Sequence, residues 1–575
     1  MKHFAKETEI TTIDNKKAYN WLISLAINAL ILVAVMFFTS VAYETNDDFA
    51  ISRELTAGYP YVGFVNYFLC RGLIAVQNYF PEHNVFMISQ IVMSFICFTV
   101  LLKIFIDRRE SWLEAVPAVF ACLLFSFDHY GSVQFTKTAA LLMIAGLIWA
   151  VDNYCHERKP AAFVFAFLLF YIGVAYREKG MFPAIAFAGV FMLVWWIVNR
   201  KEVFQKGKTI RELGLICMIL VILVAPYGID KLSDRVNAST PELKFSREYQ
   251  AERRMVTDYP VMKYYEENKD KYDAAGLSEN DIFVVDRFIF DYDGSASIEN
   301  LRTINSINAP YRTSTMTPVK ALKKAVKYAL NSMRSINFSG MHIILAVLLF
   351  IYILLLNKPE GWAYSIMICG VTLLIYVAIY YLQRVQYRAL YVAEAGAVFW
   401  LIYASLSARR RTAPKLRAAC VLVIAAAVLC MTVPAKNLVN AVDKHNRAQL
   451  IPQTQIDYFA ANPDKFFIGP TTSMGMSPAY ADPLGRAESP ANMADTGGWD
   501  TMTPYRLAAL EEYGISNPIK DLIDNPDVLY VGEGKQKTLT EYFNKWYCAK
   551  GEKVRFEKVD EVDGTGIYRV VKSKS

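Results

Sequence analysis

Charged side chains and the residue types that build metal and redox centres are scarce in this chain. Only 20% of its 575 residues are Asp, Glu, Lys or Arg, six are His and nine are Cys. The cysteines form no CxxC pair and no Cys/His spacing, so the sequence offers neither a disulfide framework nor a structural zinc site. It also contains no Walker A, GxSxG or HExxH motif, which removes three common sequence signals of catalysis.

Apolar residues are abundant instead, and they occur in long runs. They make up 54% of the sequence, more than a single water-soluble core can bury. Apolar stretches of about 18 or more residues predict transmembrane helices. We expect about eleven, at 20–43, 84–106, 113–128, 138–152, 161–176, 181–199, 213–228, 340–356, 362–381, 391–407 and 418–434. The sequence therefore predicts an α-helical polytopic membrane protein.

Lysine and arginine collect in the segments on one side of the predicted spans. These residues include Lys17, Lys103, Arg108, Arg109, Arg158, Lys159, Arg200, Lys201, Lys358, Arg409, Arg410 and Arg411. Because basic segments stay in the cytoplasm, we expect a plasma-membrane protein with its N-terminus inside and its C-terminus outside. The net charge of +7 then reflects topology, and no nucleic-acid partner is predicted.

The segment Tyr59–Phe80 is apolar enough to raise the alternative of a further span. Arg71 lies in its middle, and Asn66 and Gln77 add polar groups. A span here would also put Arg108 on the opposite side from the N-terminal lysines. We therefore expect an interfacial helix, within a near-membrane region at about 44–82.

Two long polar stretches are predicted to lie outside the membrane. The first, 229–339, is a charged and helical outer loop, long enough to have structure and function of its own. The second mixes short apolar strands with helical stretches and ends in a hairpin that turns at Asp563 and Gly564. We expect a transmembrane domain at 1–434, with the outer loop, and a small extracytoplasmic α/β domain at 435–575.

The acidic stretch Glu44–Asp48 follows the first span directly, at the predicted outer face. Carboxylates are costly near a bilayer, so a pair held at the mouth of a bundle is a candidate site. Asp47 or Asp48 is suited to act as a general base, because a carboxylate in a partly dry site can take a proton from a hydroxyl. The alternative is that these acids cap the helix that follows, where Asp is favoured.

The loop between the third and fourth spans holds a second candidate. Asp128 lies in this loop and Lys137 opens the fourth span. Asp128 is suited to orient an acceptor or to bind a cation, and the alternative is a plain polar pair at the membrane interface. These residues indicate no specific cofactor, and binding of a divalent cation remains an alternative.

Basic residues in short outer turns run against the usual charge bias of membrane loops. The turns in question contain Arg177, Glu178 and Lys179, and Arg384 and Arg388. Arg binds phosphate through two N–H groups and Lys binds it as a point charge, so both turns are candidates to hold a lipid phosphate. The alternatives are snorkelling to lipid headgroups or pairing with neighbouring glutamates.

The order of these features resembles that of the GT-C superfamily of integral membrane glycosyltransferases. The shared features are a first span followed by an outer acidic pair, near-membrane helices, many spans with short outer loops and a C-terminal outer domain. The resemblance is best in the first roughly 200 residues. It implies that Asp47 or Asp48 is the catalytic base or, as in some members, a metal ligand.

The resemblance also implies a reaction. A hexosyl or pentosyl group would pass, with inversion, from a polyprenyl-phosphate donor to an acceptor at the outer face. The acceptor would be an envelope glycan, lipid or protein, and membrane lipids would surround the site.

Two other classes of membrane protein remain as alternatives to a glycosyltransferase. An envelope-lipid transporter or flippase is expected to show matched halves and polar groups near the midplane, whereas here the ionisable residues collect at the outer ends of spans. A polysaccharide polymerase or ligase is expected to carry arginines and a histidine in its large outer loop, and no histidine occurs between 229 and 339.

The predicted topology can be tested by labelling cysteines in intact cells. A membrane-impermeant thiol reagent should modify Cys548 from outside, because the C-terminal domain is predicted to be extracytoplasmic. Outside labelling of an Arg410→Cys variant would overturn this topology.

Overall fold

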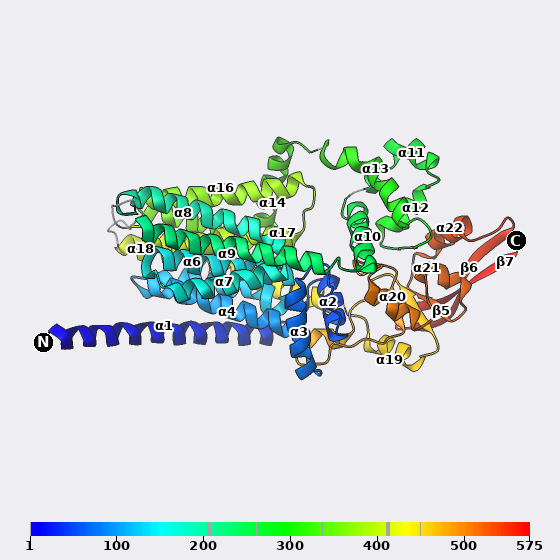
Figure 1. Cartoon of the computed structure of the whole chain (residues 1–575), viewed down its shortest axis with the longest axis horizontal. Helices are drawn as coiled ribbons and strands as arrows, with labels where there is room; N and C mark the ends of the chain where they lie inside the picture. Colours follow the sequence, from blue (N-terminus) through cyan, green and yellow to red (C-terminus); the bar gives the residue numbers. More distant parts are fainter. Residues whose placement is uncertain are drawn as a thin grey trace.

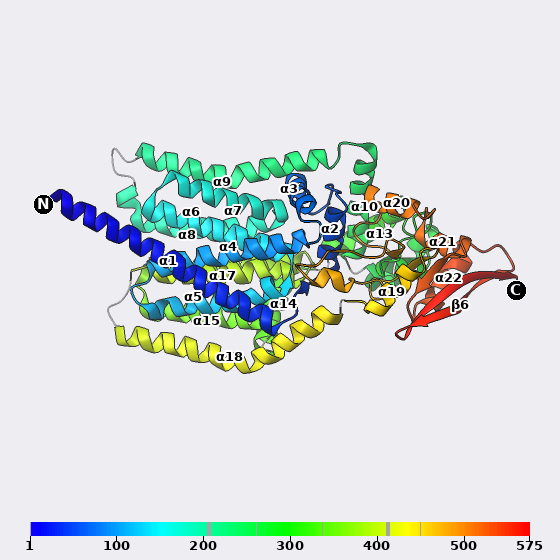
Figure 2. The ribbon, with the colours of Figure 1, turned by 90° about the horizontal axis from the view of Figure 1, so that it is seen from below.

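The computed structural model describes residues 2–203, 209–259, 261–314, 316–335, 337–409, 414–448 and 450–574. A long helical bundle forms one part of the molecule, and the outer loop and the C-terminal domain lie together at one of its ends (Figure 1). Figure 2 shows the same division from a second direction, with the two chain termini at opposite ends. The basic residues Arg410 and Arg411 lie outside the described residues.

Nine segments in the described residues are long and apolar enough to cross a membrane. The helices that carry them are α1 (Lys2–Phe38), α4 (Val85–Arg108), α5 (Val116–Ser126), α6 (Phe135–Asp152), α8 (Met181–Val203), α9 (Thr209–Val236), α15 (Phe338–Leu356), α16 (Pro359–Tyr381) and α17 (Tyr387–Ser407). The prediction of an α-helical multi-pass membrane protein is confirmed.

The other two predicted spans, 161–176 and 418–434, also fall on helices. The first lies on α7 (Pro160–Tyr176), which has only 17 residues. The second lies on α18 (Pro414–Ala448), in which the side chains at 427–438 lie outside the described residues. The count of eleven spans therefore stays a prediction. So does the domain boundary at 434, which falls inside α18.

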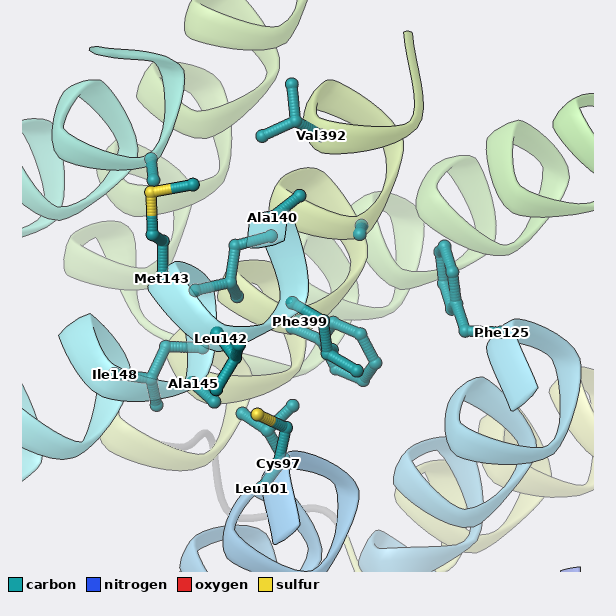
Figure 3. Packing of buried hydrophobic residues seen from close by; sticks show 14 of the residues in the cluster. Cys97, Leu101, Phe125, Ala140, Leu142, Met143, Ala145, Ile148, Val392 and Phe399 are labelled. Atoms are coloured by element: carbon teal, nitrogen blue, oxygen red, sulfur yellow. The ribbon is translucent and has the colours of Figure 1, made fainter. Parts of the chain in front are cut away.

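The core of the bundle is built around α6 and α17, whose side chains are almost all buried. Figure 3 shows Cys97 of α4, Leu142 of α6 and Phe399 of α17 in one packed cluster. Close approach of α6 and α7 depends on small residues. A Cβ atom added at Gly173 would lie 2.7 Å from Met143 Cγ and 2.9 Å from the Ala139 carbonyl oxygen.

The first span ends earlier than the predicted residue 43. Helix α1 stops at Phe38, and β1 (Ala42–Tyr43) pairs in parallel with β2 (Ser132–Val133). The side-chain amide of Asn446 supports the turn by donating to the Ser40 carbonyl at 2.9 Å. The backbone groups of Ala42 and Tyr43 bond to β2, and the Ser40 carbonyl bonds to Asn446. These residues are therefore no longer helical.

The near-membrane region contains two short helices, α2 (Asn46–Thr56) and α3 (Tyr67–Tyr79). With 13 residues, α3 has a length of about 20 Å, which is too short to cross a hydrocarbon core of about 30 Å. Arg71 lies on its exposed face. This geometry agrees with the interfacial interpretation of Tyr59–Phe80 and disagrees with a further span.

The outer loop is helical, as predicted. It holds α10 (Pro241–Thr257), α11 (Lys269–Ala274), α12 (Glu279–Asp286), α13 (Ile298–Ser314) and α14 (Pro318–Ser335). Helix α9 continues to Val236, so the loop begins several residues after the predicted position 229.

The C-terminal region contains the predicted α/β arrangement. Its sheet has the strand order β4-β3-β5-β7-β6. The strands are β3 (Phe466–Gly469), β4 (Met493–Asp495), β5 (Val528–Val531), β6 (Glu552–Val562) and β7 (Thr565–Lys574), and the helices are α19 (Gln453–Ala461), α20 (Pro504–Glu511), α21 (Pro518–Asp524) and α22 (Gln536–Trp546). The β6–β7 hairpin turns at Asp563 and Gly564, which both have positive φ. This is the backbone conformation of a tight hairpin turn.

Polar contacts join the C-terminal region to α2 and to the outer loop. Asp500 lies between Arg53 of α2, at 2.6 Å, and Arg506 of α20, at 3.1 Å. Thr496 accepts a hydrogen bond from the Phe290 amide at 3.0 Å and donates one to the Phe288 carbonyl at 2.9 Å. The near-membrane helices, the outer loop and the C-terminal region are therefore in direct contact.

We expect Gly173→Leu to lower the free energy of unfolding by about 1–3 kcal/mol, because the added side chain overlaps α6. The matched control is Gly189→Leu, where an added Cβ meets open space. Thermal unfolding of both variants in detergent measures the effect. Equal melting temperatures for the two variants would contradict the packing of α6 against α7.

Candidate functional site

The site lies at the end of the bundle that meets the soluble regions, and the β1–β2 pair organises it. Glu44 follows β1, and its backbone N–H donates to the Val133 carbonyl at 2.9 Å. This contact brings Glu44 beside the start of α6. There, Lys137 Nζ lies 2.6 Å from Glu44 Oε2 and 2.5 Å from Asp128 Oδ1.

Lys137 and Asp128 therefore form a buried ion-pair group with Glu44. The Lys137 side chain is only 1% exposed. The Tyr387 hydroxyl donates to Asp128 Oδ2 at 2.9 Å, so both oxygens of this carboxylate have partners. No group of three or more His, Cys, Asp or Glu side chains in the described residues could hold a metal ion. The proposed role of Asp128 in orienting an acceptor stays a prediction.

Asp48 caps the N-terminus of α6. It is fully buried, and its Oδ1 accepts a hydrogen bond from the Phe135 backbone N–H at 2.8 Å. Its Oδ2 accepts one from Thr45 Oγ1 at 3.0 Å. Burial is the main cause that raises the pKa of Asp48 to about 8, and the neighbouring Asp47 contributes to the rise. Asp48 therefore binds the first turn of α6, and the predicted alternative, a cap on the helix that follows the acids, is not what the structure shows.

Asp47, one residue earlier in the first turn of α2, points elsewhere. Its side chain is 19% exposed, and its Oδ2 lies 3.1 Å from the Arg388 guanidinium. Arg388 belongs to the first turn of α17, far away in the sequence. Of the two predicted acids, Asp47 is the one that an incoming molecule can reach.

Arg177 lies between α7 and α8 and stacks on two aromatic rings. Its guanidinium carbon is 4.7 Å from the ring centre of Phe64 and 5.7 Å from that of Phe135. Burial lowers the pKa of Arg177, and the positive charges of Arg388 and Arg384 lower it further, against the opposing effect of Glu178 and Asp47. The predicted basic turns therefore lie close enough to Asp47, and to each other, to interact electrostatically.

The remaining predicted residues belong to the same neighbourhood. Lys179 interacts electrostatically with Arg177, Glu178 and Arg384. Arg384 also forms an ion pair with Asp258, at the end of α10. The structure thus brings together Asp47 and both basic turns, whereas Asp48, Asp128 and Lys137 lie in the buried layer beneath them.

A cavity of 360 Å³ opens beside this cluster, and most of its walls were not predicted. Arg253 and Arg254 of α10 line one side, and Arg253 lies near enough to Asp47 to feel its charge. Aromatic rings line another part: they are Tyr59, Tyr61, Phe64 and Trp499. The dense run of tyrosines after residue 58 was the available sequence signal, whereas arginines on a polar helix look like ordinary solvated charges.

Trp499 brings the C-terminal region into this cavity. Its ring lies 5.0 Å from Phe64, the ring on which Arg177 stacks. Its Nε1 atom is buried without a hydrogen-bond partner in the described part of the chain. The following residue, Asp500, holds the segment in place through Arg53 and Arg506, and these two charges keep the pKa of Asp500 below its ordinary value.

In comparison with solved structures, the chain is similar to ArnT from Cupriavidus metallidurans in the apo state. The identity is 12%, the TM-score is 0.40, and the match covers 96% of this chain and 98% of that chain. ArnT bound to undecaprenyl phosphate gives 13% identity and a TM-score of 0.37, over 95% and 97%. No protein-family model matches the chain, and no curated protein matches it in sequence.

The burial of Asp48 predicts a specific pH dependence of stability. An unfolded Asp ionises near pH 4, whereas folded Asp48 ionises near pH 8. Between these values the folded state binds more protons, so the free energy of unfolding falls as pH rises from about 4 to about 8. Asp48→Asn keeps the acceptor for Phe135 and removes this dependence. Melting temperatures of both proteins across that range should converge at low pH and diverge at high pH; parallel curves would contradict the assignment.

Proposed function

We propose that the protein is a glycosyltransferase of GT-C type. It transfers a sugar from a polyprenyl-phosphate donor to a cell-envelope acceptor at the outer face of the plasma membrane. One observation supports this most directly. Asp47 interacts with the cations Arg177 and Arg388, and also with Arg253, which lines a cavity of arginines and aromatic rings.

The cations suit the phosphate of the donor. The Arg177 guanidinium has no ion pair with any described residue, and it lies over the rings of Phe64 and Phe135. It is therefore available for two parallel hydrogen bonds to phosphate oxygens. Because burial has already removed much of its hydration, binding an anion there is favoured.

Asp47 suits the role of general base. It takes the proton of the acceptor hydroxyl as the hydroxyl oxygen forms a bond to the anomeric carbon. The bond between that carbon and the donor phosphate breaks, and its electron pair leaves with the phosphate. Arg177 and Arg388 stabilise the charge that grows on this leaving group. One displacement of this kind inverts the anomeric centre.

The cavity suits a sugar and part of its acceptor. Its volume of 360 Å³ lies in the range of small-molecule sites, and flat aromatic walls with a few polar groups are typical of such sites. The candidate groups lie at one end of the bundle. A transporter site is expected near the midplane, which makes the enzyme the better-supported function.

The test compares two neighbouring acids. We expect Asp47→Asn to lower turnover by about 10²- to 10⁴-fold, because a base acts mainly in the transition state. Binding of undecaprenyl phosphate should change little. Asp48→Asn is the matched control and should keep most of the activity, because it preserves the cap of α6.

The assay uses the full-length protein in liposomes with a panel of undecaprenyl-phosphate hexose and pentose donors and an envelope extract as acceptor. Release of undecaprenyl phosphate measures turnover, and its retention by the protein measures binding. Normal turnover by the Asp47→Asn variant would remove the chemical centre of the proposal. Loss of activity in Asp48→Asn alone would transfer the role to the buried acid.

A further inference from the structure

Helix α14, the last helix of the outer loop, presents three different faces. Ala321, Ala325 and Ser332 are buried against the bundle. Next to them, the apolar residues Val319, Leu322, Val326 and Leu330 remain exposed. The third face is basic and carries Lys320, Lys323, Lys324, Lys327 and Arg334. Figures 1 and 2 place α14 at the end of the bundle that adjoins the soluble regions.

The basic face of α14 carries charges that no described residue neutralises. None of the five cations has an ion pair within the described part of the chain, and all are exposed. An exposed apolar face beside a basic face is the pattern of a helix that lies in the membrane interface. The apolar face then contacts hydrocarbon and the basic face contacts anionic headgroups.

An apolar crevice of 350 Å³ continues from α14 along the side of the bundle. It is lined by Ala329 and Leu330 of α14, Ala346 and Phe350 of α15, and Leu373 of α16. Leu330 and Leu373 are also exposed on the outer surface of the bundle, so the crevice opens toward the lipid phase. A hydrocarbon chain is the occupant that fits such a lining.

A rigid wall closes the inner side of the crevice. Glu394 of α17 accepts hydrogen bonds from the Tyr376 hydroxyl at 2.7 Å and from Ser339, and it pairs with His342 Nδ1 at 2.8 Å. The His342 ring stacks on Phe125 at 3.9 Å between ring centres. This cluster joins α15, α16 and α17 on the inner side of the crevice.

The same wall separates the crevice from the candidate site. Phe125, His342 and Tyr391 are fully buried and in ring contact with one another, and they stand between the crevice and the Lys137–Asp128 pair. An acyl chain bound in the crevice therefore does not reach Asp47. This geometry favours a resident membrane lipid over the donor.

We propose that α14 and this crevice together bind one anionic phospholipid of the outer leaflet. One acyl chain fills the crevice between α14, α15 and α16, and the headgroup phosphate lies against the lysines of α14. The proposal does not depend on the reaction proposed above.

The experiment measures phospholipid retained by the purified full-length protein after washing in detergent. The probes are phosphatidylglycerol and phosphatidylcholine with identical acyl chains, counted by native mass spectrometry. We expect one phosphatidylglycerol per chain to be retained in preference to phosphatidylcholine. Replacing Lys320, Lys323, Lys324 and Lys327 with Gln should weaken that retention at least about tenfold, because each lysine contributes to anionic-lipid binding.

Two sets of control variants distinguish binding of the lipid headgroup from binding of its acyl chain. Replacing Lys537, Lys550, Lys553 and Lys574 with Gln removes equal charge from the exposed C-terminal region and should leave retention unchanged. Ala346→Trp fills the crevice and should expel the lipid, whereas Leu355→Trp, on the exposed side of the same helix, should not. Melting temperatures identify any variant that has lost its fold.

Three results would overturn the proposal. The first is equal retention of both phospholipids by the wild-type protein. The second is displacement of phosphatidylglycerol by stoichiometric undecaprenyl phosphate, which would assign the crevice to the donor. The third is a lipid-free dimer that Ala346→Trp dissociates, which would assign it to a second copy of the chain.

Discussion

The buried charge of Lys137 is the constraint on which the end of the bundle beside the soluble regions depends. An ammonium group removed from water costs several kcal/mol unless anions surround it. Asp128 supplies one anion from the helical turn Phe127–Gly131 after α5, and Glu44 supplies the other from the position after β1. Glu44 reaches this position because β1 and β2 pair, and that pairing also fixes where α2 begins. The direction in which Asp47 points is thus set by the neutralisation of a lysine in another helix.

Much of this arrangement could be predicted from the sequence, and the reasons are physical. Apolar runs and the distribution of lysine and arginine identify the helices and the end at which charges collect. Arg177 and Arg388 stand out because arginine is rare in short outer turns. Which of Asp47 and Asp48 is buried could not be predicted, since it depends on the Phe135 amide, which lies 87 residues from Asp48.

The walls of the cavity show a second limit of prediction from sequence. Arg253 comes from a helix that looks like ordinary soluble structure. Trp499 follows two glycines, a pattern that suits an aromatic contact with a sugar but is more typical of a structural turn. Their position depends on contacts between α10, α2 and the C-terminal region, such as the pairing of Arg53 with Asp500. The first span shows the same limit, because its hydropathy continues to residue 43 while strand pairing ends the helix at Phe38. Local sequence indicates the secondary structure that a segment favours. The positions of Arg253 and Trp499 and the end of the first helix depend instead on contacts with residues distant in the chain.

The bond between Arg53 and Asp500 also has a consequence for how the protein is made. Chains are synthesised from the N-terminus, so Arg53 leaves the ribosome long before the residue that neutralises it. Until Asp500 has been synthesised, α2 lacks this anchor and Trp499 is absent from the cavity. A chain that stops early can insert its helices yet cannot complete the pocket. Assembly of the site is therefore a late event, and only a full-length chain carries it.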